Sequence, residues 1–135
     1  MLPNITEEKD KVKIAVVAHD GKKADMVSFI MKRLKFFKRD DVELVGTGTT
    51  GTMVQNAGLK VDLVASGPMG GDAEIGAMVT KGTVDCVIFF RDPLGKHPHD
   101  VDVSMLLRLC DVHNTPLATN YNSANIMIKY FKNKK

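Results

Sequence analysis

Runs of apolar residues alternate with amphipathic stretches along the whole chain, and this alternation predicts the fold. Residues 13–18 (KIAVVA) form a continuous, β-branched run, which predicts a strand buried on both faces. Further apolar runs predict strands at residues 42–45, 62–65, 84–90 and 116–119. Between the first two strands, apolar residues with helical spacing predict one helix that carries Met26, Phe29, Ile30, Leu34 and Phe37.

Helical patterns also follow each of the later strands, so five strands alternate with five helices. Such alternation predicts a three-layer α/β/α fold around a five-stranded parallel sheet, Rossmann-like in its right-handed crossovers. We expect one domain over residues 12–135, preceded by a short solvated lead at residues 1–11, and a last helix that begins near Asn122 or Ser123. The apolar positions expected inside the later helices are Met53, Val54, Ala57, Val103, Leu106, Leu107, Cys110, Met127, Tyr130 and Phe131.

Composition narrows the class of protein. The 135 residues are 44% hydrophobic and 26% charged, which is ordinary for a globular domain. The net charge of +3 depends on four lysines in residues 129–135, so the body is nearly neutral and shows no nucleic-acid footprint. No apolar run approaches a membrane span and the charged start is unlike a signal peptide, so we expect a cytoplasmic protein. Cys86 and Cys110 lack metal-binding spacing and are expected to be reduced.

The unusual polar residues cluster directly after predicted strands. These clusters are His19 and Asp20 with Lys23, the Gly/Thr segment at residues 46–51, the run SGPMGGD at residues 66–72, and residues 92–102. The carboxyl ends of parallel strands share one edge of the sheet, and ligands bind in the crevice outside that edge. We therefore expect all four clusters to form one site.

The Gly/Thr segment, GTGTTG, is a candidate phosphate cradle. It offers three hydroxyls and several backbone amides at a predicted helix N-terminus, and Lys23, Ser66 and Gly67 add donors nearby. It also matches the GxGxxG pattern of dinucleotide-binding folds, but it follows the second strand, and the next strand does not end in an acidic residue. It has no Walker lysine either, so a small phosphate monoester fits best. The alternative is a helix start rich in capping threonines.

Asp72 and His99 are the candidate catalytic groups. Asp72 is a lone carboxylate where a helix begins, so it is either a general base or only the N-cap. Two acidic residues, Asp100 and Asp102, are close enough in sequence to orient the ring of His99. The HPH run at residues 97–99, with His19 or Asp92, is an alternative metal site, although its ligand spacing is not recognisable.

The combination of a carboxylate base, an imidazole and a phosphate cradle predicts enolisation of a ketose phosphate. The carboxylate removes a proton beside the carbonyl group, and the imidazole hydrogen-bonds the oxygen that gains charge. Triosephosphate isomerase divides the work between its residues in the same way.

Five motifs, in this order along the chain, resemble the methylglyoxal synthase family. They are AHD at residues 18–20, GTTG at 48–51, SGPMGGD at 66–72, FFRDPL at 89–94 and PHD at 98–100. The resemblance implies a methylglyoxal synthase-like fold and the conversion of dihydroxyacetone phosphate to methylglyoxal and inorganic phosphate, with no metal or organic cofactor. It also implies a homohexamer that phosphate inhibits.

The resemblance assigns roles to individual residues. Asp72 matches the catalytic base, and His99 matches the histidine that contacts the substrate oxygens and moves protons between them. Asp20, Asp92 and Asp102 match acidic positions near the site with supporting roles, and Asp102 is counted with Asp72 and His99 as a catalytic residue. The implied substrate contacts are His19, Lys23, Thr47, Gly48, Thr49, Thr50, Ser66, Gly67 and His99.

Two other functions stay open. The fold also resembles the allosteric regulatory domain of carbamoyl phosphate synthetase, a small-anion binding module that needs the cradle but not the base. A sugar-phosphate isomerase would instead retain the phosphate in its product.

One feature differs from longer members of the family. They carry a C-terminal extension with an arginine that reaches a phosphate site, whereas no arginine follows Arg108 in this chain. The C-terminal lysines lack the bidentate fork of arginine. We therefore expect phosphate regulation to differ from that of the longer members.

Overall fold

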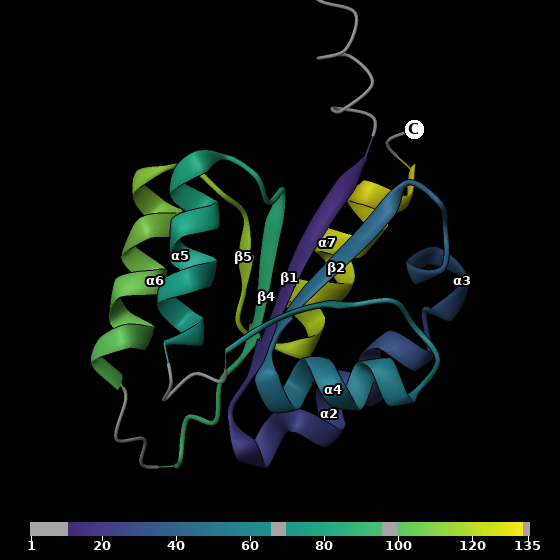
Figure 1. Ribbon diagram of the computed structural model, residues 1–135, viewed down its shortest axis with the longest axis horizontal. Helices are drawn as coiled ribbons and strands as arrows, with labels where there is room; N and C mark the ends of the chain where they lie inside the picture. Colours follow the sequence, from purple (N-terminus) through teal and green to yellow (C-terminus); the bar gives the residue numbers. More distant parts are fainter. Residues whose placement is uncertain (1–10, 66–69, 96–99, 134–135) are drawn as a thin grey trace, which may run out of the picture.

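A five-stranded parallel sheet forms the centre of the computed structural model, which describes residues 11–65, 70–95 and 100–133, without the side chains of residues 100–102 (Figure 1). The strand order is β3-β2-β1-β4-β5, and every neighbouring pair is parallel. The predicted sheet is therefore confirmed, with small differences at the strand ends. The strands are β1 (Val12–Ala18), β2 (Val42–Thr47), β3 (Asp62–Val64), β4 (Cys86–Phe90) and β5 (Leu117–Ala118).

β1 occupies the middle of the sheet because its residues are apolar on both faces. Ile14 and Val16 belong to one core cluster, and Ala15 and Val17 belong to the other. β1 pairs with β2 on one side and with β4 on the other, so the chain changes direction across the sheet between β3 and β4. Open sheets of this kind bind ligands outside the strand ends at such a switch point. The loops after β1 and β4 are thereby brought side by side.

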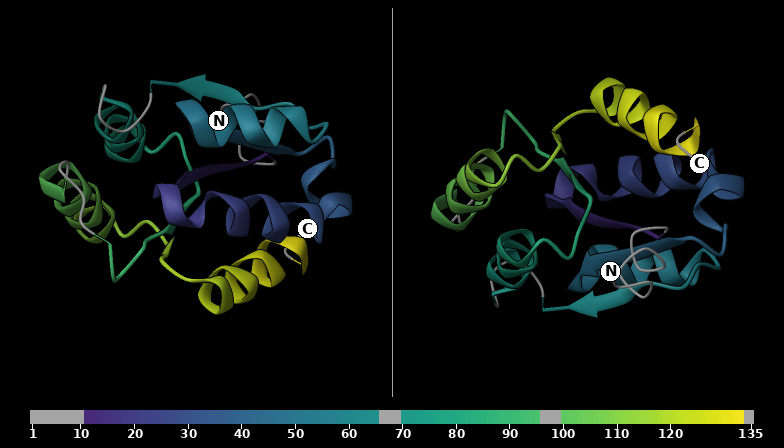
Figure 2. Two further views of the ribbon diagram at one scale, coloured as in Figure 1. Left: turned by 90° about the horizontal axis from the view of Figure 1, so that it is seen from below. Right: turned by 90° about the horizontal axis from the view of Figure 1, so that it is seen from above.

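Helices cover both faces of the sheet, which confirms the three layers (Figures 1 and 2). One face packs against α2 (Lys23–Met31), α3 (Leu34–Phe37), α4 (Gly48–Asn56) and α7 (Tyr121–Asn133), and the 3-10 turn η1 (Asp20–Lys22) precedes α2. The other face packs against α5 (Gly71–Lys81) and α6 (Asp100–Val112). Among the described residues, no helix combines the length and hydropathy that a membrane span needs.

The structure divides the predicted first helix into α2 and α3. At the break, the backbone N–H of Arg33 donates to Ile30 O at 3.0 Å, three residues back. The carbonyl of Phe29 accepts instead from Arg33 Nη1 at 3.0 Å, and Arg33 Nη2 donates to Asn125 Oδ1 of α7 at 2.8 Å. The prediction of one continuous helix is wrong, since a side-chain donor held by a distant helix satisfies the carbonyl at the break.

The last helix differs from its prediction in two respects. It begins at Tyr121, directly after Asn120, whose Oδ1 accepts from the backbone N–H of Ser123 at 2.9 Å as an N-cap does. The expectation that Tyr130 lies inward is wrong, because its side chain is 59% exposed. The buried stripe is instead made by Ala124, Ile128 and Phe131, at intervals of four and three residues.

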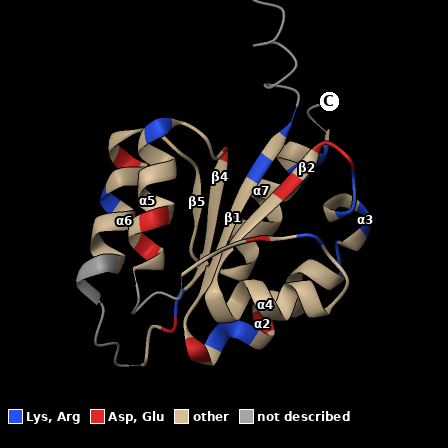
Figure 3. Ribbon diagram, viewed as in Figure 1, with Lys and Arg blue, Asp and Glu red and all other residues tan. Residues whose placement is uncertain are grey.

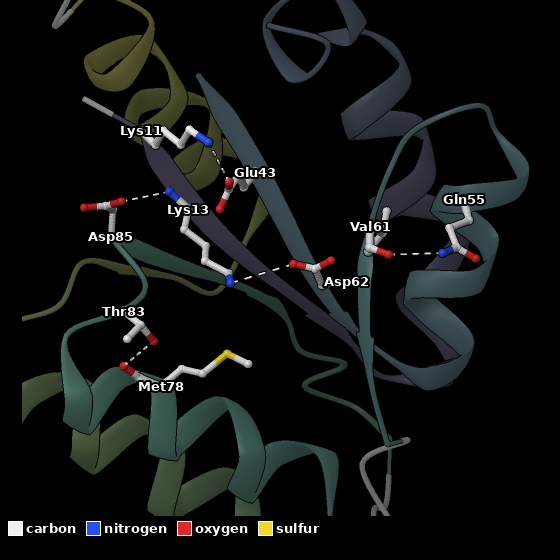
Figure 4. Close-up of polar contacts among 9 residues, drawn as sticks. All are labelled: Lys11, Lys13, Glu43, Gln55, Val61, Asp62, Met78, Thr83 and Asp85. Carbon is white, nitrogen blue, oxygen red and sulfur yellow. Dashed lines mark hydrogen bonds and ion pairs between the residues drawn. The ribbon is translucent and has the colours of Figure 1, made fainter. Parts of the chain in front are cut away.

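Hydrogen bonds at the amino end of the sheet align the strand starts (Figure 4). The backbone N–H of Lys13 donates to Asp85 Oδ2 at 2.8 Å, and the N–H of Asp85 donates to Lys13 O at 2.7 Å. The Lys13 ammonium lies 3.8 Å from Asp62 in β3, a pair open to solvent that contributes little. Gln55 Nε2 donates to Val61 O at 3.0 Å and holds the end of α4 beside the start of β3. These contacts lie at the amino ends of the strands, whereas the polar clusters lie at the opposite, carboxyl edge of the sheet.

Candidate active site

The carboxyl edge of the sheet gathers the ends of the strands and the first turns of α2, α4, α5 and α6 (Figure 1). Of the predicted site residues, Ser66, Gly67 and His99 lie outside the described residues. Asp102 belongs to the first turn of α6, but its side chain is likewise outside the description. The predicted residues that the structure describes at this edge are His19, Lys23, Thr47, Gly48, Thr49, Thr50 and Asp72.

His19 joins the segment after β1 to the segment after β4. Its backbone N–H donates to Phe90 O at 3.1 Å, and its Nδ1 accepts from the backbone N–H of Asp92 at 3.0 Å. The ring is 5% exposed and stands edge-on to Phe89, with 5.1 Å between the ring centroids. Because Nδ1 acts as an acceptor, the neutral imidazole carries its proton on Nε2. A substrate oxygen in reach of Nε2 would therefore meet a donor.

Lys23 supplies a positive charge at the first residue of α2. Its ammonium lies 2.7 Å from Asp20 Oδ1, and Figure 3 shows acidic and basic residues together along η1 and the start of α2. The Asp20 side chain is 96% exposed, so water screens this pair and Lys23 keeps most of its capacity to bind another anion.

The Gly/Thr segment is mainly the first turn of α4 rather than a loop. The helix begins at Gly48 after the N-cap Thr47, and the Thr47 side chain makes no capping hydrogen bond. The third helical residue, Thr50, is 1% exposed, and its hydroxyl has no hydrogen-bond partner within the described part of the chain. Leaving a buried hydroxyl unpaired costs free energy. A buried hydroxyl donor in the first turn of a helix is suited to binding an anion.

The glycines of this segment let α4 approach the sheet. A Cβ on Gly46 would lie 3.0 Å from Gly51 Cα, and a Cβ on Gly51 would lie 3.1 Å from Gly46 O. The backbone N–H of Gly48 donates to Ala65 O at 3.3 Å, which joins α4 to the end of β3. The GxGxxG spacing therefore serves close packing of a helix on a strand, one of the uses that glycine has in dinucleotide-binding folds.

Asp72 is the second residue of α5, and only 1% of it is exposed. The N-cap position belongs to Gly70, which has a φ of +100°, a value that favours glycine. The alternative that Asp72 is the N-cap is therefore wrong. A carboxylate in the first turn of a helix is stabilised by the partial positive charge there.

Two residues without an assigned role tie these segments together. Glu74 Oε1 accepts from the backbone N–H of Ala65 at 2.8 Å, which fixes α5 to the end of β3. Asp92 Oδ1 accepts from the N–H of Leu94 at 3.1 Å, and a Cβ on Gly21 would lie only 2.8 Å from Asp92 Oδ2. Sequence reasoning overlooked Glu74, although an acidic residue in the first turn of a helix was the available signal.

The predicted alternative of a metal site finds no support in the described residues. His97 and His99 lie outside them, and the described residues contain no group of three or more His, Cys, Asp or Glu side chains that could hold a metal. Nδ1 of His19, the other imidazole considered, already accepts the Asp92 N–H.

Comparison with known proteins decides the family. The MGS-like domain family matches residues 29–119. The methylglyoxal synthase of Carboxydothermus hydrogenoformans is 50% identical over 119 residues, which cover 87% of this chain and 97% of that protein. This chain belongs to the methylglyoxal synthase family. The methylglyoxal synthase of Geobacillus sp. strain WCH70 is 55% identical over 119 residues, which cover 87% of this chain and 84% of that protein.

Solved structures agree with membership of the methylglyoxal synthase family. The crystal structure of methylglyoxal synthase from Elizabethkingia anophelis has a TM-score of 0.82 at 41% identity, and the match covers 88% of this chain and 78% of that one. The crystal structure of ForH, at 16% identity and a TM-score of 0.57, shares the fold alone. The resemblance carried by the motifs and the predicted α/β/α fold class are therefore confirmed.

Proposed function

We propose that this chain is a methylglyoxal synthase, a lyase that converts dihydroxyacetone phosphate to methylglyoxal and inorganic phosphate. Family membership carries this proposal, because relatives about half identical over nearly the whole chain bear that name. The wholly buried carboxylate of Asp72 in the first turn of α5 adds to it, since a binding module needs no such group. The reaction needs no redox partner, because the atoms of the substrate are only redistributed between the two products.

The proposed reaction begins with proton transfer to Asp72. The carboxylate removes a proton from the carbon that bears the free hydroxyl, and the carbonyl oxygen takes up negative charge as the enediolate forms. His99 donates a hydrogen bond to that oxygen and moves a proton between the two substrate oxygens, with Asp102 in support. The electron pair of the enediolate then expels phosphate with the electrons of its C–O bond. The remaining enol becomes methylglyoxal by proton transfer to carbon.

The proposed phosphate cradle is the first turn of α4 with Lys23. Thr47, Gly48, Thr49 and Thr50 offer hydroxyl and amide donors, Ser66 and Gly67 add donors from the neighbouring segment, and His19 contacts the substrate. The hydroxyl of Thr50 supports this role, as it is buried and has no partner among the described residues. Donors held in place for the departing phosphate would stabilise charge that grows as the C–O bond breaks.

The same resemblance leads us to propose a cytoplasmic homohexamer that binds no nucleic acid and is inhibited by its product phosphate. Sedimentation velocity of the purified chain tests the oligomer, and initial rates with added phosphate test the inhibition. A monomer, or rates unaffected by phosphate, would contradict these two properties without affecting the proposed reaction.

Incubation with dihydroxyacetone phosphate tests the proposed function directly. We expect free phosphate and a dicarbonyl compound to appear in equal amounts. A sugar-phosphate isomerase would release no phosphate, and a regulatory module would bind the compound without turnover.

Asp72→Asn tests the base. Without a group that accepts the proton, kcat should fall by at least about 100-fold. The matched control is Asp111→Asn, which changes an exposed carboxylate at the C-terminal end of α6 and should leave kcat unchanged. Near-normal turnover by Asp72→Asn would reject the assigned role.

A further inference from the structure

A cavity lies at the carboxyl edge of the sheet, beyond the ends of β4 and β5. Its volume is about 500 Å³, a size typical of small-molecule sites. η1 and the start of α2 form one wall, the segment after β4 forms another, and the turn from β5 into α7 forms the third. None of the described residues that line it belongs to the proposed substrate site.

The cavity carries an uncompensated positive charge. Arg91 is exposed and, within the described residues, makes no hydrogen bond or ion pair. Lys22 lines the same cavity, with its ammonium 3.6 Å from Asp25 Oδ2 in an exposed pair. Among the described lining residues, two cations stand against one carboxylate, which leaves a net positive charge. The planar guanidinium of Arg91 is suited to bidentate binding of carboxylate or phosphate.

The apolar part of the cavity is formed by aromatic rings that pack against one another. The rings of Phe90 and Tyr121 stack with 6.1 Å between centroids, and both stand edge-on to Phe29. The hydroxyl of Tyr121 accepts from Arg33 Nη1 at 3.4 Å, and the Arg33 guanidinium lies 4.0 Å from the centroid of the Phe29 ring. An apolar body placed against Phe90, Tyr121 and Pro93 would meet a surface that is already in position.

Asn120 adds a directed donor. Its Oδ1 accepts from the backbone N–H of Ser123, and this bond leaves the amide nitrogen as the group available to a ligand. Thr119, which also lines the cavity, offers a hydroxyl. The described lining residues therefore present side-chain donors from three segments of the chain, as binding of an anion requires.

From this arrangement we propose that the cavity is a second ligand site, which binds a small organic anion. A phosphate or carboxylate head would pair with Arg91 and Lys22 and accept a hydrogen bond from Asn120. A short apolar body would pack on Phe90 and Tyr121. The site is distinct from the phosphate cradle at α4.

The chain contains its own reporter for this site. It has two tyrosines and no tryptophan, so Tyr130→Phe leaves Tyr121 as the one tyrosine that emits. We would titrate this variant with n-butyl phosphate and with butyrate, neither of which absorbs near the tyrosine band, and with potassium chloride as the ionic-strength control. We expect a saturable change in Tyr121 emission with at least one of the two anions. Comparing the two titrations shows whether the site prefers a phosphate or a carboxylate head.

Three further variants locate the binding. Added to the single-tyrosine background, Arg91→Gln should weaken binding at least about tenfold, because it removes a charge-assisted pair. Arg108→Gln, an exposed arginine on α6, should leave it unchanged. Lys23→Gln, which weakens the proposed cradle, should also leave the Tyr121 signal intact.

The proposal fails if neither anion produces a saturable signal, or if Arg91→Gln and Arg108→Gln titrate alike. It also fails if Lys23→Gln abolishes the signal, since the anion would then be bound at the cradle. None of these readouts depends on turnover, so they stand apart from the test of the proposed lyase activity.

Discussion

Replacing Thr50 by valine should raise stability and lower activity at the same time. Thr50 is 1% exposed, and its hydroxyl has no hydrogen-bond partner among the described residues. A buried polar group that is left unpaired costs about 1–3 kcal/mol, and valine has nearly the same shape without the hydroxyl. The free protein should therefore gain about 1–2 kcal/mol in the free energy of unfolding.

Thermal unfolding measures this gain. For a chain of this length the unfolding entropy is about 0.3 kcal/mol/K, so 1 kcal/mol corresponds to about 3–4 °C. We expect Thr50→Val to raise Tm by about 4–7 °C in ligand-free buffer. The matched control is Thr52→Val on the same helix, where the hydroxyl donates to Gly48 O at 2.9 Å and is exposed. That control should lose stability slightly, because it gives up a hydrogen bond.

Activity should change in the opposite direction. A hydrogen bond to a charged group contributes about 1.5–3 kcal/mol, so kcat/KM for dihydroxyacetone phosphate should fall by about 10- to 100-fold in Thr50→Val. A fall in kcat as well as a rise in KM would show that the hydroxyl acts on the departing phosphate. The reasoning is refuted if Thr50→Val lowers Tm and leaves kcat/KM unchanged, since the hydroxyl would then serve the protein itself.

Three further predictions concern packing and titration. Gly46→Ala would place a Cβ 3.0 Å from the backbone of α4 and should lower Tm by several degrees and raise KM, whereas Gly58→Ala, with open space but a φ of +105°, should lower Tm alone. Arg33→Lys should cost about 1–2 kcal/mol in urea unfolding, since lysine cannot bond Asn125 and the carbonyl at the break together. An Asn125→Ala background should reduce that cost. Burial raises the pKa of the Cys110 thiol to about 11, so the folded state holds this proton more tightly than the unfolded chain. Stability should therefore fall as pH rises from about 9 towards 11, and Cys110→Ala should flatten that slope in urea titrations.

The order of elements and the family could both be predicted from the local pattern of the sequence. Local residues alone are enough to recognise the apolar run of β1, which is buried on both faces, and the apolar helical stripes that follow each strand. The five motifs are equally local, and they place the chain with the methylglyoxal synthases. Because the sheet is parallel, His19, Thr47 and Asp92 lie at or directly beyond strand ends that share one edge.

The details that depend on contacts between distant residues came only with the tertiary structure. The break between α2 and α3 contains neither glycine nor proline. It depends on the hydrogen bond from Arg33 to Asn125, which is ninety-two positions further along the chain. The N-cap of α5 is Gly70 rather than Asp72, and Gly70 has a φ of +100°, which favours glycine. The pairing of His19 Nδ1 with the Asp92 N–H joins loops seventy-three residues apart. Periodicity reports how a residue relates to its near neighbours, whereas these bonds depend on which surfaces meet after the sheet has formed.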